Sequence, residues 1–113
     1  MSEFDALRKA LLKFRDERDW EQFHDSKNLA SAIGIEAAEL NELFLWKNSK
    51  EDIESVDKER ISEELADIFS FAILLAEKHD LDIAEIVQNK IKKNSEKYPV
   101  EKAKGSAKKY TEL

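Results

Sequence analysis

Two pairs of carboxylates recur at matching positions in two segments of the chain. The first pair, Glu36 and Glu39, lies in "EAAELNELFLW", and the second pair, Glu64 and Asp67, lies in "EELADIFSF". Apolar residues surround both pairs at the same offsets, so the two segments form a short internal repeat. Carboxylates in such a repeat can hold a metal ion or move protons.

The carboxylates fall on or beside the apolar face of each predicted helix. At about 100° per residue, Glu36 lies inside the arc formed by Leu29, Ile33 and Leu40, and Glu39 lies about 60° further round, at the edge of the arc. Glu64 and Asp67 take nearly the same two positions on the second helix. A buried carboxylate is unfavourable unless it is paired, hydrogen-bonded or bound to a metal.

Antiparallel packing of the two helices through these faces would bring four carboxylates together. Without compensation they would repel one another, and some would be forced to hold protons. Oxygen-only ligands select a hard divalent cation, so we predict a Mg²⁺ site, with Mn²⁺ as a substitute. The predicted metal-binding and catalytic residues are Glu36, Glu39, Glu64 and Asp67.

Two other interpretations of buried carboxylates compete with this one. A four-helix di-iron protein requires Glu-x-x-His pairs, and neither Glu36 nor Glu64 has a His three residues on, which argues against that class. The second is a non-catalytic helical oligomerisation module, whose core glutamates pair with Lys90 and with arginines such as Arg60. That module would bind no metal.

The elements that must position these residues are helical. Only 2 Gly and 1 Pro occur in the chain, and helical spacing of apolar residues predicts an all-α domain over residues 1–98. Ser2, Asp57 and Asp82 are predicted N-caps. The predicted helices cover about 3–19, 27–47, 58–79 and 83–98, with loops at 20–26 and 48–56. Residues 99–113 form a charged tail, for which we predict order only with a partner or ligand.

Composition narrows the classes of function. The chain has 113 residues, enough for one domain, and its small size favours a homo-oligomer that buries more apolar surface. A net charge of −6 argues against a general nucleic-acid binder. There is no cysteine for a disulfide or a thiolate metal site, and no apolar run long enough for a membrane span. We therefore expect a cytoplasmic protein without nucleic-acid or membrane partners.

The Glu-x-x-Glu and Glu-x-x-Asp pairs resemble the signature of the MazG-like all-α nucleoside triphosphate pyrophosphohydrolases. The segments "RDERDWEQFH", "NLASAIGIEAAELNELFLW" and "KYPVEKAKGSAKKYTEL" are similar to the dCTP pyrophosphatase branch of that family. The resemblance implies a four-helix bundle-like fold, assembled as a homotetramer. It also implies hydrolysis of a (deoxy)nucleoside triphosphate, dCTP or a related pyrimidine nucleotide first, to monophosphate and pyrophosphate, with Mg²⁺ held by the four carboxylates.

Aromatic residues near the carboxylates are candidates for binding the base. The candidates for base stacking are Trp20, Phe23 and Trp46, because the two tryptophans lie outside or at the margin of the apolar stripes. A lid over the core is the open alternative for these rings. His24 and Asn28 lie beside Trp20 and could recognise a base edge, although capping or loop hydrogen bonds are an open alternative. Phe71 stands where many relatives have a tyrosine, so selectivity for the sugar stays open.

The fourth predicted helix offers a cation. Lys90 falls in an apolar arc, with Asn94 one turn further on the same face. From the residues alone, a structural ion pair between Lys90 and a glutamate is an equal alternative to substrate binding. The resemblance implies that Lys90 and Asn94 contact the nucleotide.

Overall fold

The computed structural model describes residues 2–113, and all regular structure in that range is helical. The all-α class is therefore confirmed. No helix in this range is both long and apolar enough to cross a lipid bilayer. The elements are α1 (Glu3–Glu17), η1 (Glu21–Phe23), α2 (Ser26–Glu42), α3 (Lys50–Glu54), α4 (Lys58–Lys78), α5 (Ile83–Lys97), α6 (Val100–Ala103) and η2 (Tyr110–Glu112).

Side-chain caps fix where the main helices begin. Ser2, Asp57 and Asp82 each accept a hydrogen bond from a backbone N–H in the first turn, as predicted. Asp25 caps α2 in the same way, so this helix begins at Ser26. Because the caps satisfy otherwise unpaired N–H groups, they set the register of the helices that carry the carboxylates.

Two details of the predicted secondary structure were wrong. Helix α2 ends at Glu42 rather than near residue 47, because the chain leaves the helix through a series of turns. The predicted loop contains α3, a single short helix whose N-cap is Ser49 and whose first turn holds two acids that favour the helix dipole. The tail contains α6 and η2, and the Tyr98 and Tyr110 rings meet edge to face at 5.9 Å.

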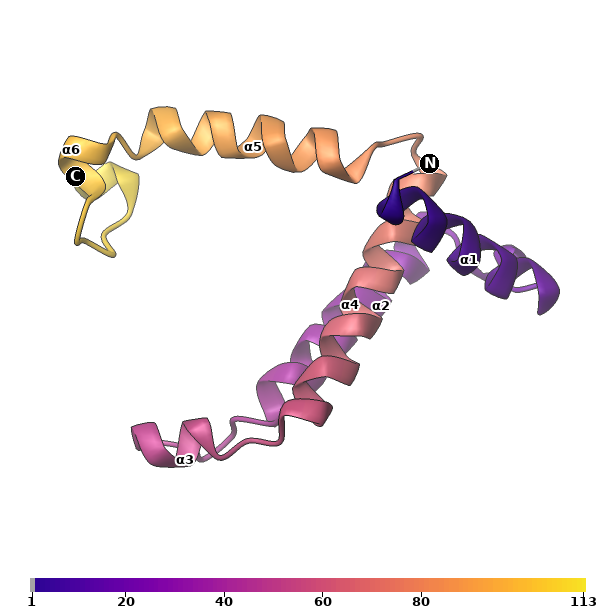
Figure 1. Ribbon diagram of the computed structural model, residues 1–113, viewed down its shortest axis with the longest axis horizontal. Helices are drawn as coiled ribbons and strands as arrows, with labels where there is room; N and C mark the ends of the chain where they lie inside the picture. The colour runs from indigo at the N-terminus through magenta and orange to yellow at the C-terminus, as the bar shows by residue number, and fades with distance from the viewer. Residues whose placement is uncertain (1) are drawn as a thin grey trace. The chain divides into compact units, whose positions relative to one another are not determined.

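The chain divides into two compact units. The first contains the residues up to His79, and the second is Asp80–Leu113. In the first unit α2 and α4 lie side by side, and α3 joins them at one end (Figure 1). Their contact holds the most buried apolar residues that the structure describes, Leu29, Ile73, Leu74 and Ala76. This helix pair therefore forms the core on which the carboxylate repeat lies.

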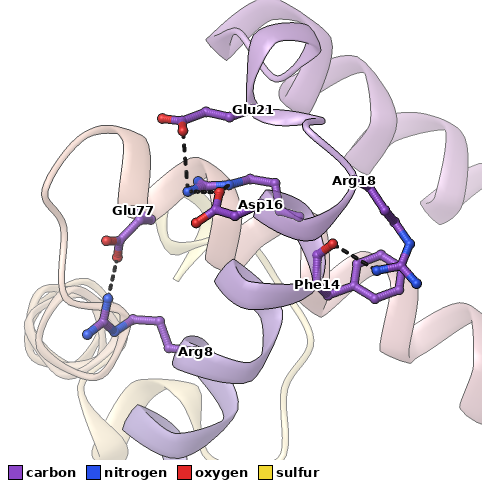
Figure 2. A network of polar contacts seen from close by, with 7 residues as sticks. Arg8, Phe14, Asp16, Arg18, Glu21 and Glu77 are labelled. Atoms are coloured by element: carbon purple, nitrogen blue, oxygen red, sulfur yellow. Dashed lines mark hydrogen bonds and ion pairs between the residues drawn. The ribbon is translucent and has the colours of Figure 1, made fainter.

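Polar contacts hold α1 against this core and shape the turn that follows it. Arg8 Nη1 lies 2.9 Å from Glu77 Oε2 on α4, as Figure 2 shows. Near the end of α1, the guanidinium of Arg18 lies 3.8 Å from the centre of the Phe14 ring and donates a hydrogen bond to the Phe14 carbonyl. The Phe14 ring in turn meets the Trp20 ring edge to face at 5.7 Å, which positions Trp20 beside the core.

Candidate active site

Helices α2 and α4 bring three of the predicted carboxylates together. One carboxylate oxygen each from Glu36, Glu64 and Asp67 lies within 4.8 Å of the others. Glu36 and Glu64 are half-buried and Asp67 is exposed. The packing of the two helices thus places acidic groups from residues far apart in the sequence within reach of one ion.

The cluster contains polar atoms that have no protein partner. Glu36 Oε2 and Glu64 Oε2 are buried, and neither makes a hydrogen bond within the described chain. Burial raises the pKa of Glu36 to about 7, and the neighbouring carboxyls of Glu39 and Glu64 and the charge of Asp67 act in the same direction. An oxygen-only donor set with unsatisfied buried atoms fits a hard divalent cation.

The cluster carboxylates take part in none of the ion pairs found among the described residues. The ion pairs among the described residues are Arg8 with Glu77, Arg15 with Asp16 and Glu21, and Lys50 with Glu54. Arg60, which belongs to the same unit, pairs with no cluster carboxylate there. The glutamates therefore lack the partners that a structural role within their own unit would give them.

Glu39 lies beside the cluster without belonging to the group of three. Its side chain is exposed, as its place at the edge of the apolar arc predicts, and it lines a cleft together with Glu64. Its role as a metal ligand stays a prediction.

A largely apolar cavity of about 480 Å³ opens on the Asp67 side of the cluster. Its size is that of a small-molecule site. Trp20 and His24 both contribute to it, so the structure joins two predicted base-binding residues to one of the carboxylates. The cavity is lined by Leu11, Phe14, Arg15, Trp20, His24, Asp67, Ser70, Phe71 and Leu74.

His24 lies in this cavity in an environment that disfavours the charged form of its ring. Burial lowers its pKa below the usual value of histidine, and the charges of Arg15 and Lys78 lower it further. The Nδ1 atom is buried and has no hydrogen-bond partner within the described chain. The ring lies 6.5 Å from that of Trp20 at an interplanar angle of 61°. A neutral imidazole beside an indole is suited to a hydrogen bond with a flat polar ligand.

A second, more strongly charged cleft of about 540 Å³ opens on the Glu64 side. It is lined by Glu39, Glu42, Leu43, Leu45, Trp46, Lys47, Arg60 and Glu64. Trp46 is 83% exposed and has a φ of 64°, a conformation that bulky residues seldom adopt. Backbone strain of this kind tends to occur at functional sites. The two tryptophans thus line different cavities.

Asn28 makes a local contact, and the remaining predicted substrate contacts belong to the second unit. Asn28 Nδ2 donates a hydrogen bond to the Phe23 carbonyl at 3.0 Å, which is the loop contact considered as its alternative role. Lys90 and Asn94 belong to α5 in the second unit, where both side chains are exposed. Lys90 was predicted to be buried. It is exposed because no other element of its unit covers the apolar arc.

Sequence reasoning did not predict several lining residues of the apolar cavity, among them Phe14 and Arg15. Phe14 was not a candidate site residue, and Arg15 entered only as the first residue of the segment "RDERDWEQFH". Arg15 Nη2 lies 2.8 Å from Asp16 and 3.6 Å from Glu21, so its guanidinium is held at the cavity wall. The packing of α1 against α4 brings these residues to Asp67.

Comparisons with known proteins agree with this geometry. Residues 31–113 match the model of the MazG-like family, and the chain belongs to that family. It is 40% identical over 111 residues to mouse dCTP pyrophosphatase 1 and 37% identical to the human protein. These matches cover 95% of this chain, which spans 65% of the length of these curated relatives.

A solved structure also shares the fold. A pyrophosphatase from Archaeoglobus fulgidus superposes with a TM-score of 0.84 at 36% sequence identity. The match covers 88% of this chain and 94% of the archaeal one. The arrangement of helices around the carboxylates is therefore one that a pyrophosphatase also uses.

Proposed function

We propose that the protein is a Mg²⁺-dependent nucleotide pyrophosphohydrolase that converts a deoxynucleoside triphosphate, dCTP first, to its monophosphate and pyrophosphate. The observation that supports this most is the cluster of Glu36, Glu64 and Asp67, with two buried oxygens left unpaired. Membership of the MazG-like family and the names of the similar proteins support the reaction class.

The carboxylates of Glu36, Glu64 and Asp67 would hold the divalent ion. Such an ion supplies positive charge for the phosphates and lowers the pKa of a water molecule that it binds. Glu39 is exposed beside the cluster, and we assign to it the acceptance of the proton from the attacking water. Water attacks the α-phosphorus, and the bond from that phosphorus to the α–β bridging oxygen breaks.

We assign the base to the apolar cavity on the Asp67 side. Trp20 supplies a flat face for stacking, and neutral His24 supplies a hydrogen-bonding edge. Phe71 lines the same cavity with a ring that cannot hydrogen-bond the sugar. Trp46, Asn28, Lys90 and Asn94 remain proposed substrate contacts, and the two residues on α5 would bind phosphate or sugar.

The position of bond cleavage is the first testable prediction. With dCTP, Mg²⁺ and water enriched in ¹⁸O, we expect dCMP and pyrophosphate as the first products, with no dCDP at any time. One ¹⁸O atom should appear in dCMP and none in pyrophosphate, because attack occurs at the α-phosphorus. Anion-exchange chromatography followed by mass spectrometry measures both results.

A control reaction without divalent cation, in EDTA, should show no products. The appearance of dCDP with orthophosphate as the first products would place the attack at the γ-phosphorus and contradict the proposed reaction. Incorporation of ¹⁸O into pyrophosphate would contradict attack at the α-phosphorus even if dCMP were formed.

We also propose that the protein acts as a homo-oligomer, with a tetramer expected from the resemblance. Each unit exposes large apolar side chains that a single chain leaves uncovered. On α2 and α4 these include Ile35 and Phe69, each 59% exposed, and α5 exposes Ile91 to the same extent. Burial of such surface is the main driving force for association.

Light scattering during gel filtration should therefore give the mass of several chains, four by our expectation, at micromolar concentration. Replacing Phe69 by Asp should lower that mass, because a charge would enter the apolar contact. A single-chain mass for the unaltered protein would contradict this proposal.

A further inference from the structure

Arg60 lies beside the carboxylate cluster, on the face of α4 that carries Glu64. It is in the first turn of α4, four residues before Glu64, and residues at this spacing are neighbours on a helix surface. Both residues line the charged cleft. The guanidinium and the cluster thus approach the same space from adjacent turns of one helix.

The guanidinium of Arg60 is free of protein carboxylates. Arg60 is exposed, and none of the ion pairs or side-chain hydrogen bonds found among the described residues involves it. This is notable in a cleft that also contains Glu39, Glu42 and Glu64. Arginine carries five N–H donors in a fixed planar fork, which suits the oxygens of a phosphate group.

The two cavities beside the cluster differ in chemistry. The one on the Asp67 side is walled mainly by apolar and aromatic residues, including Phe14, Trp20 and Phe71. The cleft on the Glu64 side contains two cations, Lys47 and Arg60, together with acidic residues. If the α-phosphate of a nucleotide lies at the cluster, the base and the β- and γ-phosphates extend from it in different directions, and each can enter one of the two cavities. The charged cleft is the better match for the phosphates.

We propose that Arg60 binds the β- and γ-phosphates of the substrate and then the pyrophosphate that leaves; this inference rests on the proposed function. When the bond from the α-phosphorus to the bridging oxygen breaks, the electron pair stays on that oxygen, and negative charge grows on pyrophosphate. Arg60 remains protonated throughout and donates charge-assisted hydrogen bonds to it. The proton of the attacking water goes to the carboxylate base.

Binding of inorganic pyrophosphate tests this assignment directly. Isothermal titration calorimetry in the presence of Mg²⁺ should show that R60A raises the Kd for pyrophosphate about tenfold to a hundredfold, since hydrogen bonds to charged groups are lost. The Kd for dCMP should not change, because dCMP lacks the β- and γ-phosphates. R60K should fall between the parent and R60A, because it keeps the charge and loses the fork.

The matched control is K58A, which removes a positive charge from the same turn of α4 at a residue that does not line the cleft. It should leave the Kd for pyrophosphate unchanged. If K58A weakens binding as much as R60A does, only the general charge of the helix matters and the assignment is overturned.

Two further results would also overturn it. One is an unchanged Kd for pyrophosphate in R60A together with tighter Mg²⁺ binding, which would show that Arg60 only balances the charge of the carboxylates. The other is a parent protein that does not bind pyrophosphate at all. Assaying the same preparations for conversion of dCTP to dCMP separates the two proposals. If the parent protein converts dCTP and R60A binds pyrophosphate normally, the proposed function stands without Arg60.

Discussion

Replacing Glu36 or Glu64 by Gln is expected to abolish Mg²⁺-dependent hydrolysis while leaving the protein folded. Each substitution removes a negatively charged oxygen from a cluster whose ligand atoms lie within 4.8 Å of one another. Metal-ion catalysis contributes several kcal/mol to the stability of the transition state. Because about 1.4 kcal/mol corresponds to a tenfold change in rate, kcat should fall about a thousandfold.

The variants should stay folded, because each substitution removes one negative charge from a group of carboxylates that repel one another in the metal-free protein. In the metal-free protein, E36Q or E64Q should have a thermal midpoint equal to or above that of the parent. Mn²⁺ binding, followed by electron paramagnetic resonance, should weaken strongly in both variants. E63Q is the matched control, since Glu63 is exposed on α4 next to Glu64 and lies outside the group of three.

E63Q should retain parental turnover and Mn²⁺ binding. Near-normal rates for E36Q or E64Q at saturating Mg²⁺ would refute the metal-site interpretation. A large drop in thermal midpoint without a change in Mn²⁺ affinity would instead point to a structural role for these carboxylates.

Helical periodicity predicted which carboxylates share a face, and the structure brings three of the four together. The angular positions placed Glu36 and Glu64 within the apolar arc and Glu39 and Asp67 at its edge. The structure has the first two half-buried and the other two exposed. The caps of the main helices were equally predictable, because each rests on a local contact between one side chain and one nearby N–H.

Features that depend on tertiary packing could not be predicted from the sequence. The cavity around Trp20 and His24 requires the turn after α1 to fold back toward α4, and no periodic pattern encodes that turn. The left-handed Trp46 and the short helix α3 arise where the chain leaves α2, in a segment too brief for a hydrophobic period to be recognised. As a result, Trp46 was assigned to a helix that ends at Glu42.

The prediction for Lys90 shows a different limit. An apolar arc on a helix indicates that the face is covered, without indicating by what. In the second unit Ile86 and Val87 of that arc are 39% and 49% exposed, and Lys90 is exposed with them. If the homo-oligomer proposed above covers this face, the arc would reflect a contact with another copy of the chain.

Replacing Trp20 by Ala is expected to raise the KM for dCTP about tenfold or more, with a smaller effect on kcat. Stacking of a base on an aromatic side chain contributes about 1–3 kcal/mol, whereas the carboxylates and the attacking water are untouched. Trp20 lines the apolar cavity assigned to the base, so W20A should also reduce discrimination between dCTP and other deoxynucleoside triphosphates. Steady-state kinetics with several nucleotides measures both effects.

Phe23 was also a predicted stacking residue, and it supplies the matched control for W20A because the structure leaves it outside the cavity assigned to the base. Its ring is 61% exposed in the same turn region as Trp20, and it lines none of the cavities described above. Its backbone carbonyl, which accepts the Asn28 hydrogen bond, is kept in F23A. F23A should therefore keep the parental KM, and W20A should bind inorganic pyrophosphate normally, because stacking acts only on the base. If W20A binds and cleaves dCTP as the parent does, the Trp20 indole serves only to cover the core, and base recognition would have to come from Trp46, His24, Asn28 or a neighbouring subunit.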